Sequence, residues 1–267
     1  MAKKKKIIKK TPTRVHSFRC TDKDWKELKK LAKECGMSIG KYLVETGKKH
    51  HPRQRLTPEE SKALNYLGNT HGGMLNIGEE WYIFYHRQTN QHSYSRQACA
   101  ERLEHPAPGV FKQAEVTSCG LNGGPLNGTG RYEARIACNL WSKNGVARYD
   151  KKFDKKAHPY FTQTGKDRME NGDQYIANMR DGAVAGFKYF GFGGEKRISL
   201  AVSGVCSGIV EVSHTPDFKA VIARIPVSAK GKQENAEGAF APQKGTQPLY
   251  FRYTGEGAMN FHTFEMR

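Results

Sequence analysis

Residues 131–267 alternate between apolar and polar positions over many short stretches, and this pattern predicts β-strands. The stretch RISLAVSG shows the alternation clearly, because Ile198, Leu200 and Val202 fall on one side and smaller, more polar residues on the other. Turns that contain Gly, Asn, Pro and Lys separate the stretches, and no long helical period interrupts them. Many short strands at regular spacing predict a β-sandwich, and the length of this part fits a jelly roll.

The pattern differs near the N-terminus, where residues 14–50 predict one strand followed by two helices. The stretch RVHSFRC alternates in polarity, as a strand does. Thr21 is a candidate N-cap with Asp24 three residues later, and apolar residues then recur at helical spacing. Gly36 ends this helix, and a second helix begins at Ser38.

Between these two parts, residues 65–101 contain aromatic-rich strand patterns. MLNIG and EWYIFYH predict two strands joined by a short turn at Gly78-Glu79-Glu80. Four aromatic side chains lie within the five positions from Trp81 to Tyr85, so both faces of this hairpin are apolar. We therefore expect residues 64–126 either to be loosely ordered or to pack against the C-terminal sandwich.

Charge is distributed unevenly along the chain. Residues 1–62 hold 19 of the 44 Lys and Arg residues but only 7 of the 26 Asp and Glu residues. Such asymmetry indicates a segment that binds nucleic acid or a membrane surface. No run of 18 apolar residues occurs, which excludes a transmembrane helix, and the basic start MAKKKKIIKK lacks the apolar core of a secretory signal. We therefore expect a cytoplasmic protein without a membrane partner.

The cysteines and carboxylates give little sign of a metal site. The six cysteines have no CxxC pair, so we expect reduced and mostly buried thiols. Five acidic residues could serve a structural calcium ion, although scattered acids are usually solvated charges: Asp150, Asp154, Asp167, Glu170 and Asp173. We expect no cofactor, and structural calcium is the alternative.

The N-terminal sequence RVHSFRCTDKDWKELKKLAKECGMSIGKYL resembles ribbon-helix-helix proteins, and in particular plasmid mobilization accessory proteins of the MobC type. The resemblance implies a homodimer that pairs its N-terminal strands into a ribbon and inserts this ribbon into the major groove of DNA. Val15, Ser17 and Arg19 would then face the bases, and the Lys3–Lys10 run would contact phosphates. The alternative is a solvated basic helical hairpin behind a disordered lysine tail.

The strings GNTHGG, WYIFYHRQT and SRQACAE resemble the last blade of the five-bladed propeller of family 43 glycoside hydrolases. The blades that carry this family's catalytic acids are absent, so the chain resembles a glycosidase but is expected to be inactive unless another chain supplies those acids. Two positions match residues near the family's sugar site. His71 matches a histidine that helps to hold a central water or calcium ion, and Arg87 matches an arginine that reaches toward the sugar. The alternatives are a structural loop histidine and a surface cation.

The C-terminal strings QYIANMRDGAVAGFKYFGFGG and PLYFRYTGEGAMNFHTFEM resemble family 6 carbohydrate-binding modules. Such modules bind sugars through stacked aromatic rings and a few amide and hydroxyl groups. The resemblance implies that Tyr175 stacks on a sugar and that Asn260 contributes an amide. A second ring, commonly Trp in the family, is missing from the corresponding loop, which offers only Phe240. The alternative for Tyr175 is a half-buried strand tyrosine.

These observations predict a mainly β protein: a C-terminal β-sandwich (jelly roll) preceded by a partial β-propeller blade, with a small N-terminal ribbon-helix-helix segment. The expected segments are a basic disordered tail, the ribbon-helix-helix segment, the blade remnant and the sandwich, at residues 1–13, 14–62, 63–130 and 131–267. The abrupt join near residues 58–65 indicates a gene fusion, a recombination event or an assembly error. The predicted function is recognition of a polysaccharide or oligosaccharide of the xylan or arabinoxylan type, that is, hemicellulose. The alternative is a DNA-binding plasmid mobilization protein that carries the glycosidase part as a passenger.

Overall fold

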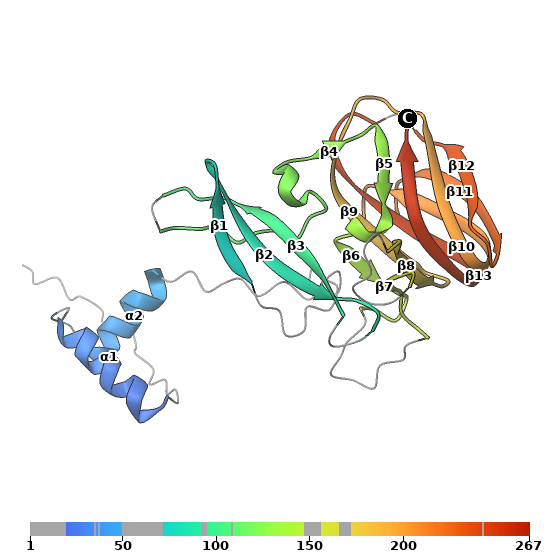
Figure 1. Ribbon diagram of the computed structural model, residues 1–267. Coiled ribbons are helices and arrows are strands. Elements are labelled where there is room, and N and C mark those ends of the chain that lie inside the picture. Colours follow the sequence, from blue (N-terminus) through green and yellow to red (C-terminus); the bar gives the residue numbers. More distant parts are fainter. Residues whose placement is uncertain are drawn as a thin grey trace, which may run out of the picture. The chain divides into compact units, whose positions relative to one another are not determined.

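The computed structural model divides the chain into two compact units, residues 1–55 and 56–267, and each is described by itself (Figure 1). The residues that the structure describes are 20–34, 36, 38–49, 72–91, 95–107, 109–146, 156–165, 172–241 and 243–267. The predicted tail and nearly all of the predicted N-terminal strand lie outside these residues. No described helix is long and apolar enough to cross a bilayer.

The first unit contains the two predicted helices, α1 (Asp22–Glu34) and α2 (Ile39–Lys49). The Thr21 hydroxyl accepts a hydrogen bond from the Asp24 backbone N–H at 3.2 Å and donates one to the Asp24 carboxylate at 2.6 Å. The Ser38 hydroxyl accepts a hydrogen bond from a backbone N–H in the first turn of α2 at 3.3 Å. The predicted N-cap at Thr21 and the predicted start of the second helix at Ser38 are therefore confirmed.

The described side chains of the helix pair bury little apolar surface. Ala32 is the one described side chain of this unit that is both apolar and buried, whereas Leu31 and Val44 are exposed. Two short helices that bury so little apolar surface need a further packing partner to be stable.

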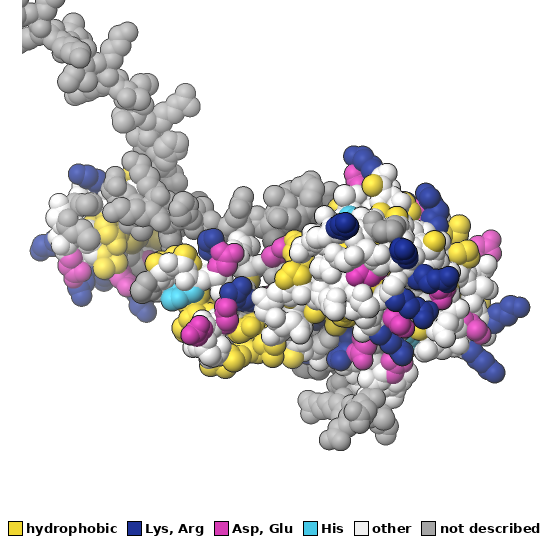
Figure 2. Space-filling view, turned by 90° about the horizontal axis from the view of Figure 1, so that it is seen from above, with side chains coloured by type: hydrophobic (Ala, Val, Ile, Leu, Met, Phe, Trp, Pro, Cys, Tyr) yellow, Lys and Arg dark blue, Asp and Glu magenta, His cyan; other side chains and the backbone are white. Residues whose placement is uncertain are grey.

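The second unit begins with a three-stranded antiparallel sheet in the order β1-β2-β3. These strands are β1 (Gly73–Ile77), β2 (Glu80–Gln88) and β3 (Arg96–Leu103), so the predicted hairpin is confirmed. A complete propeller blade has four strands, and three are described here. Every residue of β1 is exposed, including three large apolar ones, and Figure 2 shows hydrophobic side chains gathered over this part of the molecule.

A ten-stranded sheet forms the rest of the unit and confirms the predicted β-sandwich (Figure 1). Its strands are β4 (Leu126–Asn127), β5 (Gly130–Glu133), β6 (Asn139–Trp141), β7 (Tyr160–Gln163), β8 (Gln174–Met179), β9 (Ala183–Phe192), β10 (Arg197–Ser213), β11 (Val221–Lys230), β12 (Glu234–Ala239) and β13 (Gly245–Met266). β10 and β13 pair along almost their whole lengths, and their halves have different outer partners. β10 pairs first with β12 and then with β11, while β13 pairs first with β9 and then with β8 and β5.

The two long strands change their outer partners at glycine positions. The outer partner of β10 changes on either side of Gly204, which has a φ of 91°, and the facing part of β13 contains Gly257 with a φ of 79°. A Cβ atom would lie 2.4 Å from the Ala258 carbonyl oxygen at Gly204 and 2.0 Å from the Val205 carbonyl oxygen at Gly257. Only glycine fits both the backbone angle and the space.

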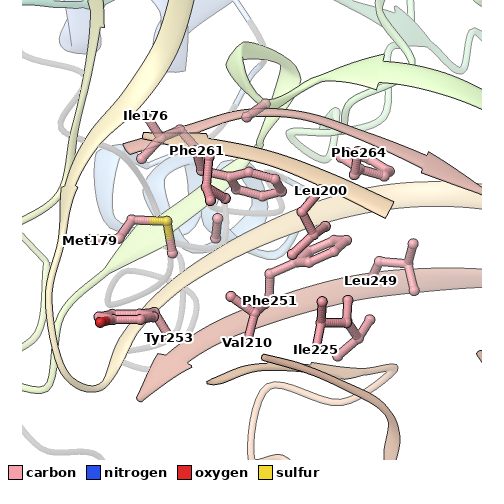
Figure 3. Packing of buried hydrophobic residues seen from close by; sticks show 14 of the residues in the cluster. Ile176, Met179, Leu200, Val210, Ile225, Leu249, Phe251, Tyr253, Phe261 and Phe264 are labelled. Atoms are coloured by element: carbon pink, nitrogen blue, oxygen red, sulfur yellow. The ribbon is translucent and has the colours of Figure 1, made fainter. Parts of the chain in front are cut away.

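Aromatic and aliphatic side chains from both layers fill one core (Figure 3). The Phe264 ring packs edge-on against Phe187 with centroids 4.8 Å apart, and it lies 5.0 Å from Phe251. Leu200 and its neighbours at positions 198 and 202 are buried, as their alternation predicts. This core fixes the positions of β8, β10 and β13, whose other faces carry the candidate site.

The three-stranded sheet packs against the sandwich through Arg87 on β2. The Arg87 guanidinium donates hydrogen bonds to the backbone oxygens of Arg135 and Ala137 and lies over the Phe161 ring, with Cζ 3.6 Å from the centroid. The Asn90 backbone N–H adds a bond to the Phe161 carbonyl oxygen at 2.7 Å. Of the two states expected for residues 64–126, the described part shows the packed one.

Candidate functional site

Five side chains form a cluster that we call the polar face: Asp173 just before β8, Tyr175 on β8, Ser203 on β10, and Asn260 and His262 on β13. Ser203 is the register partner of Asn260, and the inward-pointing pair Ile176 and Phe261 lies next to them. Neighbouring residues of a strand point to opposite sides of a sheet. Tyr175 and Asn260, which precede the buried Ile176 and Phe261, therefore point outward. The face is therefore the reverse side of the sheet that lines the core.

A β-bulge places His262 on this face. The register of β13 against β10 passes from Phe261↔Val202 to Thr263↔Ala201, so His262 is an extra residue without a partner on β10. A bulge breaks the alternation of side chains and redirects the one that it inserts. As a result, Asn260 and His262 lie close together and both reach Ser203.

A second bulge, on β8, fixes the orientation of Asn260. β8 has one residue more than β13 between their paired positions, and Asn178 in this interval has a φ of 60°. Asparagine tolerates this left-handed conformation better than most residues. The Asn178 side chain donates to the backbone oxygens of Lys156 and His158 at 2.9 Å each. Its backbone N–H donates to Oδ1 of Asn260 at 3.3 Å, which turns Nδ2 of Asn260 toward the Ser203 hydroxyl at 3.4 Å.

His262 is held by hydrogen bonds on both ring nitrogens. Nδ1 lies 3.2 Å from the Asp173 carboxylate, and Nε2 lies 2.8 Å from the Ser203 hydroxyl. Burial lowers the pKa of His262, and the nearby Asp173 charge offsets part of this effect. The imidazole is therefore neutral near pH 7. Because a carboxylate can only accept, its proton lies on Nδ1, and Nε2 accepts from Ser203.

Tyr175 provides an aromatic surface beside this network. Its ring stacks on the His262 imidazole, with centroids 4.5 Å apart and an interplanar angle of 30°. The side chain is half-buried, and burial raises the pKa of its hydroxyl. A ring flanked by an oriented amide, a hydroxyl and a neutral imidazole suits a ligand that is rich in hydroxyl groups.

The structure brings two of the predicted sugar-binding residues together and separates a third. Tyr175 and Asn260 both lie on the polar face and are linked through His262 and Ser203. Arg87 is only 6% exposed, and its donors bind protein groups, including Oε1 of Gln97 at 2.9 Å. The structure thus places Arg87 in the junction between the two sheets. Arg87 is therefore neither open to a sugar nor a cation on the surface.

Other predicted site residues fall outside the described part of the chain. These are His71, Val15, Ser17 and Arg19, so the predictions for them stay open. The loop that lacks the second ring offers no substitute, because Phe240 is 2% exposed and packs against Phe192.

The carboxylates of the blade-like sheet are engaged in structural contacts. Glu80 forms an exposed ion pair with Arg102, with two N–O distances of 2.6 Å. Glu101 is buried and accepts hydrogen bonds from the Tyr85 hydroxyl and the Thr117 backbone N–H, both at 2.9 Å. Burial raises the pKa of Glu101. These contacts indicate that Glu80 and Glu101 stabilise the structure.

The calcium ligands considered from the sequence are not assembled in the described residues. Asp173 binds His262, and the other four acids lie outside the described part. Where the structure describes the chain, no three His, Cys, Asp or Glu residues gather in a way that could hold a metal ion.

Sequence reasoning missed Ser203 and His262 and considered Asp173 only as a calcium ligand. A signal for the bulge was present, because the inward apolar residues at 259, 261, 264 and 266 are spaced by two, three and two positions. The interval of three marks the point where the alternation of β13 breaks.

Comparison with known proteins finds two separate similarities. Residues 10–78 match the family model of NikA-like mobilization proteins, "Mobilization protein NikA". A xylosidase/arabinosidase of Thermoclostridium stercorarium is 40% identical to this chain over 207 residues, which are 77% of this chain and 43% of the relative. The chain joins a segment similar to mobilization proteins to a part similar to a glycosidase. The predicted fusion of a mobilization-like segment with a glycoside-hydrolase-like part is therefore confirmed.

One solved structure shows the same fold in the larger part, and a smaller module is similar to part of it. A family 43 arabinoxylan arabinofuranohydrolase of Bacillus subtilis, in complex with cellotetraose, aligns with 74% of this chain and 41% of its own, with a TM-score of 0.50 and 19% identity. A family 6 carbohydrate-binding module of Clostridium cellulolyticum, in complex with xylose, aligns with 53% of this chain at a TM-score of 0.41 and 15% identity. The chain spans less than half the length of the two glycosidases.

The mobilization match extends further along the chain than the predicted segment. It ends at residue 78 and so includes β1, whereas the prediction ends this segment at residue 62 and the compact units divide after residue 55. The exact position of the join stays a prediction.

Proposed function

We propose that the sandwich of this chain binds carbohydrate of the hemicellulose type, with the polar face as its site. The observation that carries the proposal is the placement of the Tyr175 ring beside His262, which joins the ring to Ser203 and the oriented amide of Asn260. The similarity to a xylosidase/arabinosidase supports xylan or arabinoxylan as the ligand.

The geometry suggests how a sugar would bind. His262 covers one face of the Tyr175 ring, so a pyranose would stack on the other face. The Asn260 amide and the Ser203 hydroxyl can then exchange hydrogen bonds with sugar hydroxyls. One stacked ring contributes about 0.5–1.5 kcal/mol and each hydrogen bond about 1 kcal/mol, so we expect a Kd on the order of millimolar.

Cleavage of glycosidic bonds is not part of this proposal. Such cleavage requires two carboxyl groups that face one bond. The contacts of Glu80 with Arg102 and of Glu101 with Thr117 leave neither carboxylate arranged in this way. We expect the chain to bind the polysaccharide without cleaving its glycosidic bonds.

Isothermal titration calorimetry with xylo-oligosaccharides and arabinoxylo-oligosaccharides tests the proposal on the full chain. We expect heat of binding at millimolar ligand, an affinity about fivefold weaker in Asn260→Ala, and unchanged affinity in Tyr189→Phe, whose hydroxyl binds Glu115 on another part of the sandwich. Folded protein that gives no heat with either ligand class overturns the proposal.

A second candidate function, DNA binding in plasmid mobilization, is favoured by the match of residues 10–78 to NikA-like proteins. A second copy of the chain would supply the packing that α1 and α2 lack, with Val15, Ser17 and Arg19 on the paired strands facing the bases. We place this role in the cytoplasm, where plasmid DNA is found.

Gel retardation of a plasmid-origin DNA fragment tests this second function. Binding to phosphates weakens steeply as salt rises, whereas sugar stacking should change little. We expect retardation at low salt and its loss after deletion of residues 1–52. Unchanged retardation by the deleted chain overturns the assignment to the N-terminal segment.

A further inference from the structure

We propose that the polar face also hydrolyses carboxylic esters of sugar hydroxyls, with Ser203 as the nucleophile, His262 as the general base and Asp173 as a positioning residue. The Ser203 hydroxyl lies 2.8 Å from Nε2 of His262, and Nδ1 of the same ring lies 3.2 Å from the Asp173 carboxylate. Serine and cysteine hydrolases on unrelated folds use this order of contacts, which is recognised by geometry and not by sequence position.

The protonation state of His262 suits the role of a base. Burial keeps the ring neutral near pH 7, so Nε2 has a free electron pair to accept the Ser203 proton. Asp173 accepts the Nδ1 proton, which selects this tautomer and stabilises the imidazolium that forms when the proton moves. Two charged or titratable side chains contact the ring from β8 and the residues before it, Asp173 and Tyr175.

Asn260 provides a donor for the negative charge that develops on the ester oxygen. Nδ2 lies 3.4 Å from the Ser203 hydroxyl, on the nucleophile's own side of the sheet. The Asn178 backbone N–H holds Oδ1 of Asn260, so the amide cannot turn its oxygen toward the oxyanion without breaking that bond. A side-chain amide is one of the groups that stabilise such an oxyanion.

The reaction balances with water as the co-substrate. His262 takes the proton of Ser203 as the oxygen attacks the ester carbonyl carbon, and the carbonyl electron pair moves onto the oxygen beside Asn260. The tetrahedral adduct collapses, the carbon–alkoxy bond breaks, and the sugar alcohol leaves with the proton from His262. Water then attacks the acyl group on Ser203 in the same way, which releases the carboxylic acid and restores both side chains.

The sugar part of the substrate rests on the proposed carbohydrate binding, whereas the hydrolytic chemistry does not. Tyr175 and Ser203 both contact His262, so a sugar on the ring would present an ester on a neighbouring hydroxyl to Ser203. We take acetyl as the acyl group of the test substrates.

The experiment uses the full chain with two substrates, p-nitrophenyl acetate and acetylated xylo-oligosaccharides, and with a fluorophosphonate that labels nucleophilic serines. We expect turnover of both esters and a single labelled site at Ser203, identified by peptide mass spectrometry. Ser203→Ala and His262→Gln should each lower kcat/KM by at least about a hundredfold. Ser199→Ala, on the same strand four residues away, is the matched control and should keep full activity.

The positioning role of Asp173 has a readout of its own. Asp173 raises the pKa of His262 against the effect of burial. Asp173→Asn should therefore decrease kcat, and it should also shift the rise of kcat/KM with pH to a lower pH. A residue that only supports the fold would leave the position of this rise unchanged.

Each outcome decides a part of the proposal. No turnover by the wild-type chain above that of Ser203→Ala, or labelling at a residue other than Ser203, overturns the hydrolytic site. Turnover and labelling with p-nitrophenyl acetate but none with acetylated sugar overturns the substrate class and keeps the site. Because labelling is done on the wild-type chain, the test holds even if a variant fails to fold.

Discussion

The Tyr175 ring lies on the His262 imidazole, with centroids 4.5 Å apart, and the same imidazole hydrogen-bonds Ser203 and Asp173. An aromatic platform and a chain of hydrogen bonds therefore meet at one side chain. A change in the charge or position of His262 affects both. This relationship underlies the predictions for the polar face.

Replacement of Tyr175 by alanine should weaken the binding of xylo-oligosaccharides by about 1 kcal/mol, roughly fivefold in Kd. The sugar loses its stacking surface, and His262 loses its neighbour. Tyr175→Phe keeps the ring and should bind nearly as well as the wild type. Titration calorimetry of the three proteins checks this, and equal affinity for all three would assign Tyr175 to packing alone.

The stability of the fold should decrease as pH falls past the ordinary pKa of histidine because of His262. Burial holds the pKa of His262 below its ordinary value of 6.5, so the unfolded chain binds this proton more readily than the folded one. The contribution of neutral His262 to the free energy of unfolding is complete above pH 6.5 and is lost as pH falls toward the lowered pKa. Thermal midpoints measured from about pH 8 to pH 5 should fall more for the wild type than for His262→Gln. Parallel curves for the two proteins would contradict the assignment.

Removal of the Arg87 side chain should loosen the junction between the three-stranded sheet and the sandwich. Arg87→Ala leaves the Ala137 oxygen without its donor, leaves the Arg135 oxygen with only the Gln97 amide, and uncovers Phe161. We expect a loss of about 3 kcal/mol in the free energy of unfolding. Limited proteolysis should then cut residues 72–126 rapidly.

The matched control for this prediction is Arg102→Ala, which removes an exposed ion pair with Glu80. Exposed pairs contribute little, so this variant should unfold and digest like the wild type. If Arg87→Ala behaved in the same way, the junction would depend on contacts other than those of Arg87.

The chain should not hydrolyse aryl xylosides or aryl arabinofuranosides. Their cleavage needs paired carboxyl groups, and the described carboxylates of the blade-like sheet are bound to Arg102, Tyr85 and Thr117. Release of the aryl group by purified protein is the measurement. Turnover that is lost in Glu101→Gln would show that a buried carboxylate acts in glycosidic cleavage after all.

Local patterns in the sequence predicted the elements and part of the site. The caps at Thr21 and Ser38 and the alternation around Leu200 depend on neighbouring residues, and these predictions are confirmed. Tyr175 and Asn260 were found through a family resemblance, and the structure places both on one face.

The features that sequence reasoning missed depend on contacts between distant residues. Arg87 binds backbone oxygens 48 and 50 residues away, and nothing in its local sequence distinguishes this role from that of a surface cation. Ser203 and His262 are 59 residues apart and meet only because a bulge turns His262 outward. The register of two paired strands is set by the whole sheet and cannot be read from one strand.

Affinity electrophoresis of the full chain in a native gel that contains soluble arabinoxylan tests the central claim most directly. We predict that the wild type migrates more slowly than in a sugar-free gel, that added salt leaves this difference unchanged, and that Tyr175→Ala reduces it. Equal migration of folded wild-type protein in both gels would contradict carbohydrate binding by the polar face.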